Sequence, residues 1–110
     1  FLIFSTSALA AEPKSITFRE LPIALQMISF CESGAKQHDN KGRIIKGPLK
    51  EVGIFQIHPI HFNRALRDGF NIFDPNGNMA FALHLYNKNG LNDWLASKSC
   101  WHPKLVYRFQ

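Results

Sequence analysis

Several patterns that mark common protein classes are missing from this chain. No segment repeats at a fixed period and no low-complexity run is present, which argues against a repeat protein and against a disordered tail. The chain has no phosphate-binding loop and no serine in a nucleophile elbow. His58 and His61 are spaced to share a helix face, but no third ligand has a suitable spacing. We therefore expect neither a metal nor a cofactor.

Basic residues are not gathered in one block either, although the chain is basic. The net charge is +5, and the thirteen Lys and Arg residues are spread between Lys14 and Arg108. A basic balance favours an acidic partner such as nucleic acid, an anionic membrane or an anionic cell-surface polymer. Because only the overall charge favours nucleic acid, we expect no nucleic-acid partner.

Length and composition predict one domain with its own core. The chain has 110 residues, of which 45% are hydrophobic and 19% charged, and its ten phenylalanines suit an aromatic-rich interior. We expect residues 11–19 to form an N-terminal extension, residues 20–102 the domain, and residues 103–110 a C-terminal tail. We also expect a monomer.

Residues 1–10 predict an export signal. The stretch FLIFSTSALAAEP begins with apolar residues, continues with small ones, and places Ala8-Leu9-Ala10 shortly before Glu12-Pro13. This pattern is typical of the end of a secretory signal peptide that is cleaved after Ala10; the alternative is an ordinary hydrophobic strand or helix start. The apolar part is too short to span a bilayer. We therefore expect a secreted or periplasmic protein without stable membrane insertion.

The two cysteines fit an exported protein. In an oxidising compartment Cys31 and Cys100 can pair and link positions 69 residues apart, nearly the whole domain. The alternative is two buried free thiols. The sequence alone leaves both arrangements open.

The spacing of apolar residues predicts a mainly helical domain. Leu21, Leu25 and Ile28 fall on one face of a helix over residues 20–33, with Pro22 in its first turn. The polar stretch that follows is rich in turn signals and predicts a small β-hairpin or irregular β region, with a short strand at residues 43–46.

Three further helices are expected after this insertion. They cover residues 59–69, residues 75–90 with Asp74 as the N-cap, and residues 92–100 with Trp101 just past the end. The residues expected to point inward are Ile60, Phe62, Ala65, Leu66, Met79, Ala82, Leu83, Tyr86, Trp94 and Leu95.

Glu32 stands at the end of the first helix, in an unfavourable place for a carboxylate. It faces the negative end of the helix dipole, and its neighbours Phe30 and Cys31 offer little solvation. Both effects raise the pKa of a carboxylic acid. A carboxylic acid that stays protonated near neutral pH can serve as a general acid. The alternative is a solvent-facing glutamate at a frayed helix end.

Ordered motifs along the chain resemble a known superfamily. Glu32-Ser33 ends a helix, residues 53–57 are G-I-F-Q-I, Tyr86-Asn87 precedes a glycine, and a W-x-x-S-x-x-C-W ending begins at Trp94. Over residues 20–102 this order resembles the lysozyme-like superfamily, most closely its transglycosylase SLT type. The resemblance implies an α+β, mainly α, lysozyme-like fold with a small β insertion after the helix that carries Glu32.

The resemblance also implies an enzyme that cuts peptidoglycan between N-acetylmuramic acid and N-acetylglucosamine. Glu32 would protonate the scissile oxygen, Tyr86 would point its hydroxyl at Glu32, and Gly53 would let the backbone approach the sugar closely. Gln56 would hydrogen-bond a sugar or brace Glu32. The other residues implied to contact the substrate are Ser33, Ile54, Ile57 and Asn87. One departure is that Asn87 is followed by Lys88-Asn89-Gly90, where the family has Ala-Gly.

Glu51 raises the question of a second catalytic acid. It stands two residues before Gly53, where chicken-type lysozymes place an aspartate and lytic transglycosylases usually have a small neutral residue. A hydrolase would use Glu32 and Glu51 together. A lytic transglycosylase needs one acid, which protonates the leaving oxygen and then accepts the proton of the muramic C6 hydroxyl. We expect a lytic transglycosylase; a hydrolytic lysozyme, a non-catalytic peptidoglycan-binding module and a basic adaptor for acidic polymers are the alternatives. Asp39 is a weaker candidate acid.

Overall fold

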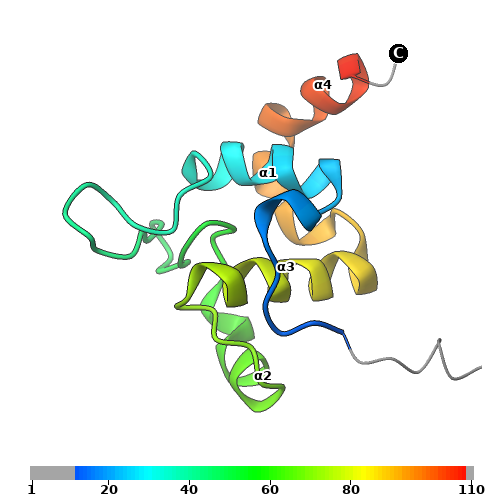
Figure 1. The fold of residues 1–110 in the computed structure, drawn as a ribbon. Helices are drawn as coiled ribbons and strands as arrows, with labels where there is room; N and C mark the ends of the chain where they lie inside the picture. Colours follow the sequence, from blue (N-terminus) through cyan, green and yellow to red (C-terminus); the bar gives the residue numbers. More distant parts are fainter. Residues whose placement is uncertain (1–11, 109–110) are drawn as a thin grey trace, which may run out of the picture.

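Four α-helices carry the fold in the computed structural model, which describes residues 12–108. They are joined by short 3₁₀ helices and by a long irregular loop that extends to one side (Figure 1). The elements in chain order are η2 (Phe18–Glu20), α1 (Ile23–Ser33), η3 (Pro59–His61), α2 (Phe62–Arg67), α3 (Pro75–Asn89), η4 (Asn92–Ser97) and α4 (Lys98–Arg108). The expected signal peptide lies outside the described residues.

Helix α1 follows the predicted pattern, except at its start. Leu25 and Ile28 are fully buried. Gly34 ends the helix in the left-handed conformation, with φ of 70°, and its N–H bonds the carbonyl of Phe30. Pro22 was expected in the first turn but is the N-cap, with an extended ψ of 146°. The residue before it, Leu21, is extended as well, as residues before proline usually are.

The predicted β insertion contains no strand within the described residues. Single antiparallel bridges join His38 to Ile44, Lys46 to Val52, and Val52 to Ile57. Turns at residues 39–42 and 47–50 separate these bridges, so no ladder extends beyond one pair. The prediction of a short strand at residues 43–46 is therefore wrong. The structure has the irregular β region that was the alternative to a hairpin.

The region between this loop and α3 is only partly as predicted. Ala65 is fully buried, but Ile60 and Leu66 are each 78% exposed rather than inward. The cause is that a 3₁₀ turn precedes a helix of six residues, so one α-helical period does not run through both. The start of α3 is as predicted: the carboxylate of Asp74 accepts the N–H groups of Asn76 and Gly77.

Two predictions for the C-terminal region are also wrong. Trp101 lies inside α4 and not past a helix end, because a new helix begins at Lys98 and continues to Arg108. Leu95 is 53% exposed, since a 3₁₀ helix with a kink at Trp94 replaces the expected α-helix there. Trp94 itself is buried as predicted.

The core lies where α1, α3, η4 and α4 meet the loop residues 52–57 and 70–72. Figure 1 shows α1 lying above α3, with α4 leaving the body at the top. A disulfide between Cys31 in α1 and Cys100 in α4 joins the two helices, so the two cysteines are not free thiols. Among residues 12–108 no helix is both long and apolar enough to cross a membrane.

Candidate active site

The side chain of Glu32 is half-buried in the last turn of α1. Its Oε2 accepts a hydrogen bond of 2.5 Å from the hydroxyl of Ser97, which ends η4. Burial raises the pKa of Glu32, the Ser97 hydrogen bond opposes that rise, and the negative charge of Glu51 adds to it. The pKa of Glu32 is therefore raised, as the sequence predicted, and burial is the largest cause.

Glu51 is held at the end of the long loop and acts on Glu32 through its charge. Its Oε1 accepts the N–H of Leu49 at 2.8 Å, and its backbone carbonyl accepts the N–H of Gly47 at 2.8 Å. A side chain at position 47 would collide with the Glu51 carboxylate and with Gln56. The loop therefore fixes Glu51, and the two predicted acids lie within electrostatic range of each other.

Gly53 begins the tight turn that follows Glu51. Its φ is +79°, and a β-carbon there would approach the amide oxygen of Gln37 to 2.5 Å and would also meet the amide of Asn78. The missing side chain thus makes room for two buried amides. In this structure the glycine is explained by packing inside the protein, and not by an opening toward a ligand.

Gln37 and Asn78 hold this turn and were not predicted as site residues. The amide of Gln37 accepts the N–H of Ile54 at 2.8 Å and donates to the carbonyl of Ile72 at 3.1 Å. Asn78 is fully buried and accepts the N–H of Phe55 at 3.0 Å, while it donates to the carbonyls of Val52 and Ile72. A signal was present in the sequence for Asn78, a polar residue on an otherwise apolar helix face.

The side chains of the G-I-F-Q-I motif do not all face outward. Ile54 is 5% exposed and Ile57 is 2% exposed, so both belong to the core. Gln56 has a left-handed φ of 51°, and its amide donates to the carbonyl of Gly53 at 3.0 Å. It makes no hydrogen bond to Glu32, so the bracing role expected for Gln56 is not observed.

A small cavity lies beside this motif. Its volume is about 30 Å³, enough for one water molecule. His61 lies 3.6 Å from Asp93 there, and burial lowers the pKa of this histidine. Glu32 is not among the residues that form the walls, which are Gln56, Ile57, His58, His61, Leu85, Asp93 and Trp94.

Ser33 connects α1 to the same turn. Its hydroxyl donates to the carbonyl of Ile54 at 2.7 Å and accepts the N–H of Lys36 at 3.1 Å. The hydroxyl was expected to bind substrate, but in the structure it joins the helix end to the G-I-F-Q-I turn. This contact helps to fix Glu32, the preceding residue.

Tyr86 and Asn87 are not joined to Glu32 by any hydrogen bond. Tyr86 is half-buried on α3, and the hydroxyl that bonds Glu32 comes from Ser97 instead. Asn87 donates to the carboxylate of Glu12 at 3.2 Å, and His84 lies 2.6 Å from the same carboxylate. That pairing lowers the pKa of Glu12. The structure therefore places Asn87 with the N-terminal segment.

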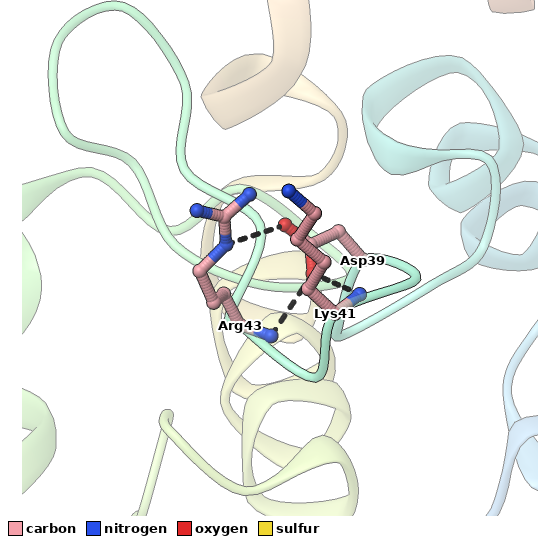
Figure 2. Close-up of polar contacts among 3 residues, drawn as sticks. All are labelled: Asp39, Lys41 and Arg43. Carbon is pink, nitrogen blue, oxygen red and sulfur yellow. Dashed lines mark hydrogen bonds and ion pairs between the residues drawn. The ribbon is translucent and has the colours of Figure 1, made fainter.

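Asp39, the weaker candidate acid, closes a turn (Figure 2). Its carboxylate accepts the backbone N–H of Lys41 at 2.8 Å and of Arg43 at 3.0 Å, and the Arg43 guanidinium at 3.2 Å. The backbone hydrogen bond from Arg43 is the largest of the contacts that lower the pKa of Asp39. An acid held in its ionised form is a poor proton donor, so this residue is explained by the turn.

Comparison of the chain with models of protein families, with curated proteins and with solved structures gives no match. Within residues 12–108 no group of three or more His, Cys, Asp or Glu side chains is arranged to hold a metal ion. The functional assignment therefore rests on the motifs and on the geometry around Glu32.

Proposed function

We propose that the protein cleaves the glycan strands of peptidoglycan with Glu32 as the proton donor. The observation that carries this proposal is the half-buried carboxyl group at the end of α1, whose pKa is raised by burial and by Glu51. A general acid for glycoside cleavage needs this bias toward the protonated form. The lysozyme-like fold, with a mainly helical body and an irregular loop after the catalytic helix, is part of the same proposal.

The proposed chemistry is that of a lytic transglycosylase. Glu32 donates its proton to the oxygen between N-acetylmuramic acid and N-acetylglucosamine as that bond breaks. The resulting carboxylate then accepts the proton of the muramic C6 hydroxyl, which attacks the anomeric carbon. The ring closes to a 1,6-anhydro sugar without water, and Glu32 returns to its protonated form.

Glu51 favours a second candidate, a hydrolytic lysozyme. Its charge acts on Glu32, and it is held in place by the N–H of Leu49. In a hydrolase it would stabilise positive charge on the sugar or attack it as the nucleophile. The same residue also suits the transglycosylase, in which it only raises the pKa of Glu32. A non-catalytic module that binds peptidoglycan without cutting it is the remaining alternative.

An exported protein fits this function. The disulfide between Cys31 and Cys100 is of the kind that persists in oxidising compartments, and peptidoglycan lies outside the cytoplasmic membrane. We propose that the protein acts at the cell wall, secreted or in the periplasm, after cleavage of the signal peptide near Ala10.

Mass spectrometry of digested peptidoglycan tests the proposed function. Purified cell walls are incubated with the protein, and the released fragments are weighed. Fragments with 1,6-anhydro ends, each lighter by one water than a reducing end, support a transglycosylase. Reducing muramic ends would replace that proposal with the lysozyme. Wall binding without released fragments would leave only the binding module.

A further inference from the structure

The hydroxyl of Ser97 has two acceptors within reach. One is Oε2 of Glu32 at 2.5 Å, and the other is the backbone carbonyl of Trp94 at 3.2 Å. A serine hydroxyl carries one proton, so it donates fully to only one of them. The Trp94 carbonyl already accepts the indole N–H of Trp101 at 2.9 Å. The shorter distance assigns the Ser97 proton to Glu32.

The position of Ser97 is fixed on both sides by buried tryptophans. The indole of Trp94 donates to the carbonyl of Phe55 at 3.2 Å, which connects η4 to the G-I-F-Q-I turn. Trp94 is 4% exposed and Trp101 is 2% exposed, so these bonds are shielded from water. Ser97 thus stands on a backbone segment that can shift little relative to Glu32.

The disulfide holds the same two segments together. Cys31 directly precedes Glu32, and Cys100 follows Ser97 by one helical turn, with 5.9 Å between the cysteine Cα atoms. The covalent bond and the Ser97–Glu32 hydrogen bond therefore join α1 to the C-terminal region at neighbouring points.

We propose that Ser97 is a positioning residue that directs the transferable proton of Glu32 to Oε1. Because Ser97 donates to Oε2, a proton on Oε2 would displace the serine hydrogen, whereas a proton on Oε1 leaves the bond intact. Oε1 is then the atom that gives up the proton and later takes one back. The Ser97 bond holds the carboxyl group in one rotamer through both steps.

Only the catalytic effect of Ser97 rests on the proposed function. The effect of Ser97 on the carboxyl group itself can be measured without any activity. Glu51 is the charged group that acts on Glu32 and raises its pKa, while the hydrogen bond from the neutral Ser97 hydroxyl lowers it. Because the two influences have opposite sign, removal of Ser97 and removal of the Glu51 charge must move the titration of Glu32 in opposite directions.

Carbon-13 NMR titration of the Glu32 carboxyl group in the full chain tests the proposal. Ser97→Ala is expected to raise the pKa of Glu32, because the ionised form loses a donor. Ser97→Thr keeps a hydroxyl and is expected to titrate like the wild type. Ser99→Ala is the matched control, since Ser99 is an exposed serine two residues away, and it should leave the titration unchanged. An unchanged pKa in Ser97→Ala, or equal shifts in Ser97→Ala and Ser99→Ala, would overturn the proposal.

Kinetics on purified peptidoglycan test the catalytic consequence. Ser97→Ala should lower kcat about tenfold, with KM changed by less than about twofold, since the lost interaction orients the acid and does not bind the sugar. The alkaline limb of its pH profile should move upward, and Ser97→Thr should restore most of kcat. A fall in kcat with an unmoved pH profile in both variants would contradict a role in proton placement. A wild-type protein that releases no fragments would refute the proposed function, while the titration of Glu32 would still decide the role of Ser97.

Discussion

Ser97 lies 65 residues beyond Glu32 in the sequence and donates its hydroxyl proton to the Glu32 carboxylate. This contact brings the end of α1 against the end of η4, close to the disulfide between Cys31, the residue before Glu32, and Cys100, three residues after Ser97. Three parts of the chain therefore act on this acid: its own helix, the long loop through the charge of Glu51, and the C-terminal region through Ser97.

The G-I-F-Q-I turn depends on a glycine that no other residue can replace. Gly53→Ala should destabilise the protein by about 2–5 kcal/mol, because a left-handed alanine costs about 1–2 kcal/mol and overpacking against Gln37 and Asn78 adds about 1–3 kcal/mol. Gly42→Ala is the matched control: its φ is +77°, but no atom lies within 4 Å of the added carbon. It should cost only about 1–2 kcal/mol. Urea denaturation of both variants measures the difference, and equal losses would contradict the packing account.

The disulfide should contribute a large part of the stability. It links residues 69 positions apart, and a loop of that length corresponds to about 4 kcal/mol of lost entropy in the unfolded chain. The double variant Cys31→Ala, Cys100→Ala should therefore have a free energy of unfolding, measured with urea, that is lower by about that amount. The reduced wild type should lose a similar amount. A loss below about 1 kcal/mol would show that the disulfide does not constrain the unfolded state as assumed.

Glu51 should tune Glu32 without being required for cleavage. Glu51→Gln removes the charge that raises the pKa of Glu32, so the alkaline limb of the activity profile should move to lower pH. In the transglycosylase, kcat should stay within about tenfold of the wild type. A loss of about a thousandfold or more, together with reducing ends in the wild-type digest, would make Glu51 a catalytic residue of a hydrolase.

Burial of Glu32 should make the protein less stable as the pH rises. The folded-state pKa of Glu32 is raised, so the folded protein binds more protons than the unfolded chain between the ordinary pKa of glutamate and the raised one. Stability contributed by this group is therefore present at low pH and falls through that interval. Glu32→Gln should be more stable than the wild type at pH 7, and the advantage should vanish at low pH. Urea titrations at several pH values test this, and a pH-independent difference would contradict it.

The sequence predicted the acid better than it predicted the groups around it. The helix end at Gly34 and the apolar surroundings of Glu32 follow from local patterns, because caps and apolar spacing act over a few residues. Glu51 was singled out only through the resemblance to lysozymes. Ser97 could not be assigned to Glu32 in this way, since 65 residues separate them and only the packing of η4 on α1 brings them together. The W-x-x-S-x-x-C-W ending contained Ser97 but gave no indication of its partner.

Errors in the predicted fold have the same origin. Ile60 and Leu66 were placed inward on one continuous helix, and a 3₁₀ turn before a short helix removed that periodicity. Asn78 was not predicted as a site residue, although its buried amide holds the turn that follows Glu51. A polar side chain inside an apolar helix face was the available signal, and its partners depend on a loop that has no regular pattern.

The most direct test of the central claim is the release of fragments from purified peptidoglycan by Glu32→Gln. This variant keeps the shape of the side chain and an oxygen that can accept from Ser97, but it has no acidic proton to transfer. Cleavage should fall by about a hundredfold or more, the usual size of a general-acid contribution, while wall binding and the folded state remain. Cleavage by Glu32→Gln at the wild-type rate would contradict the assignment of Glu32 as the acid.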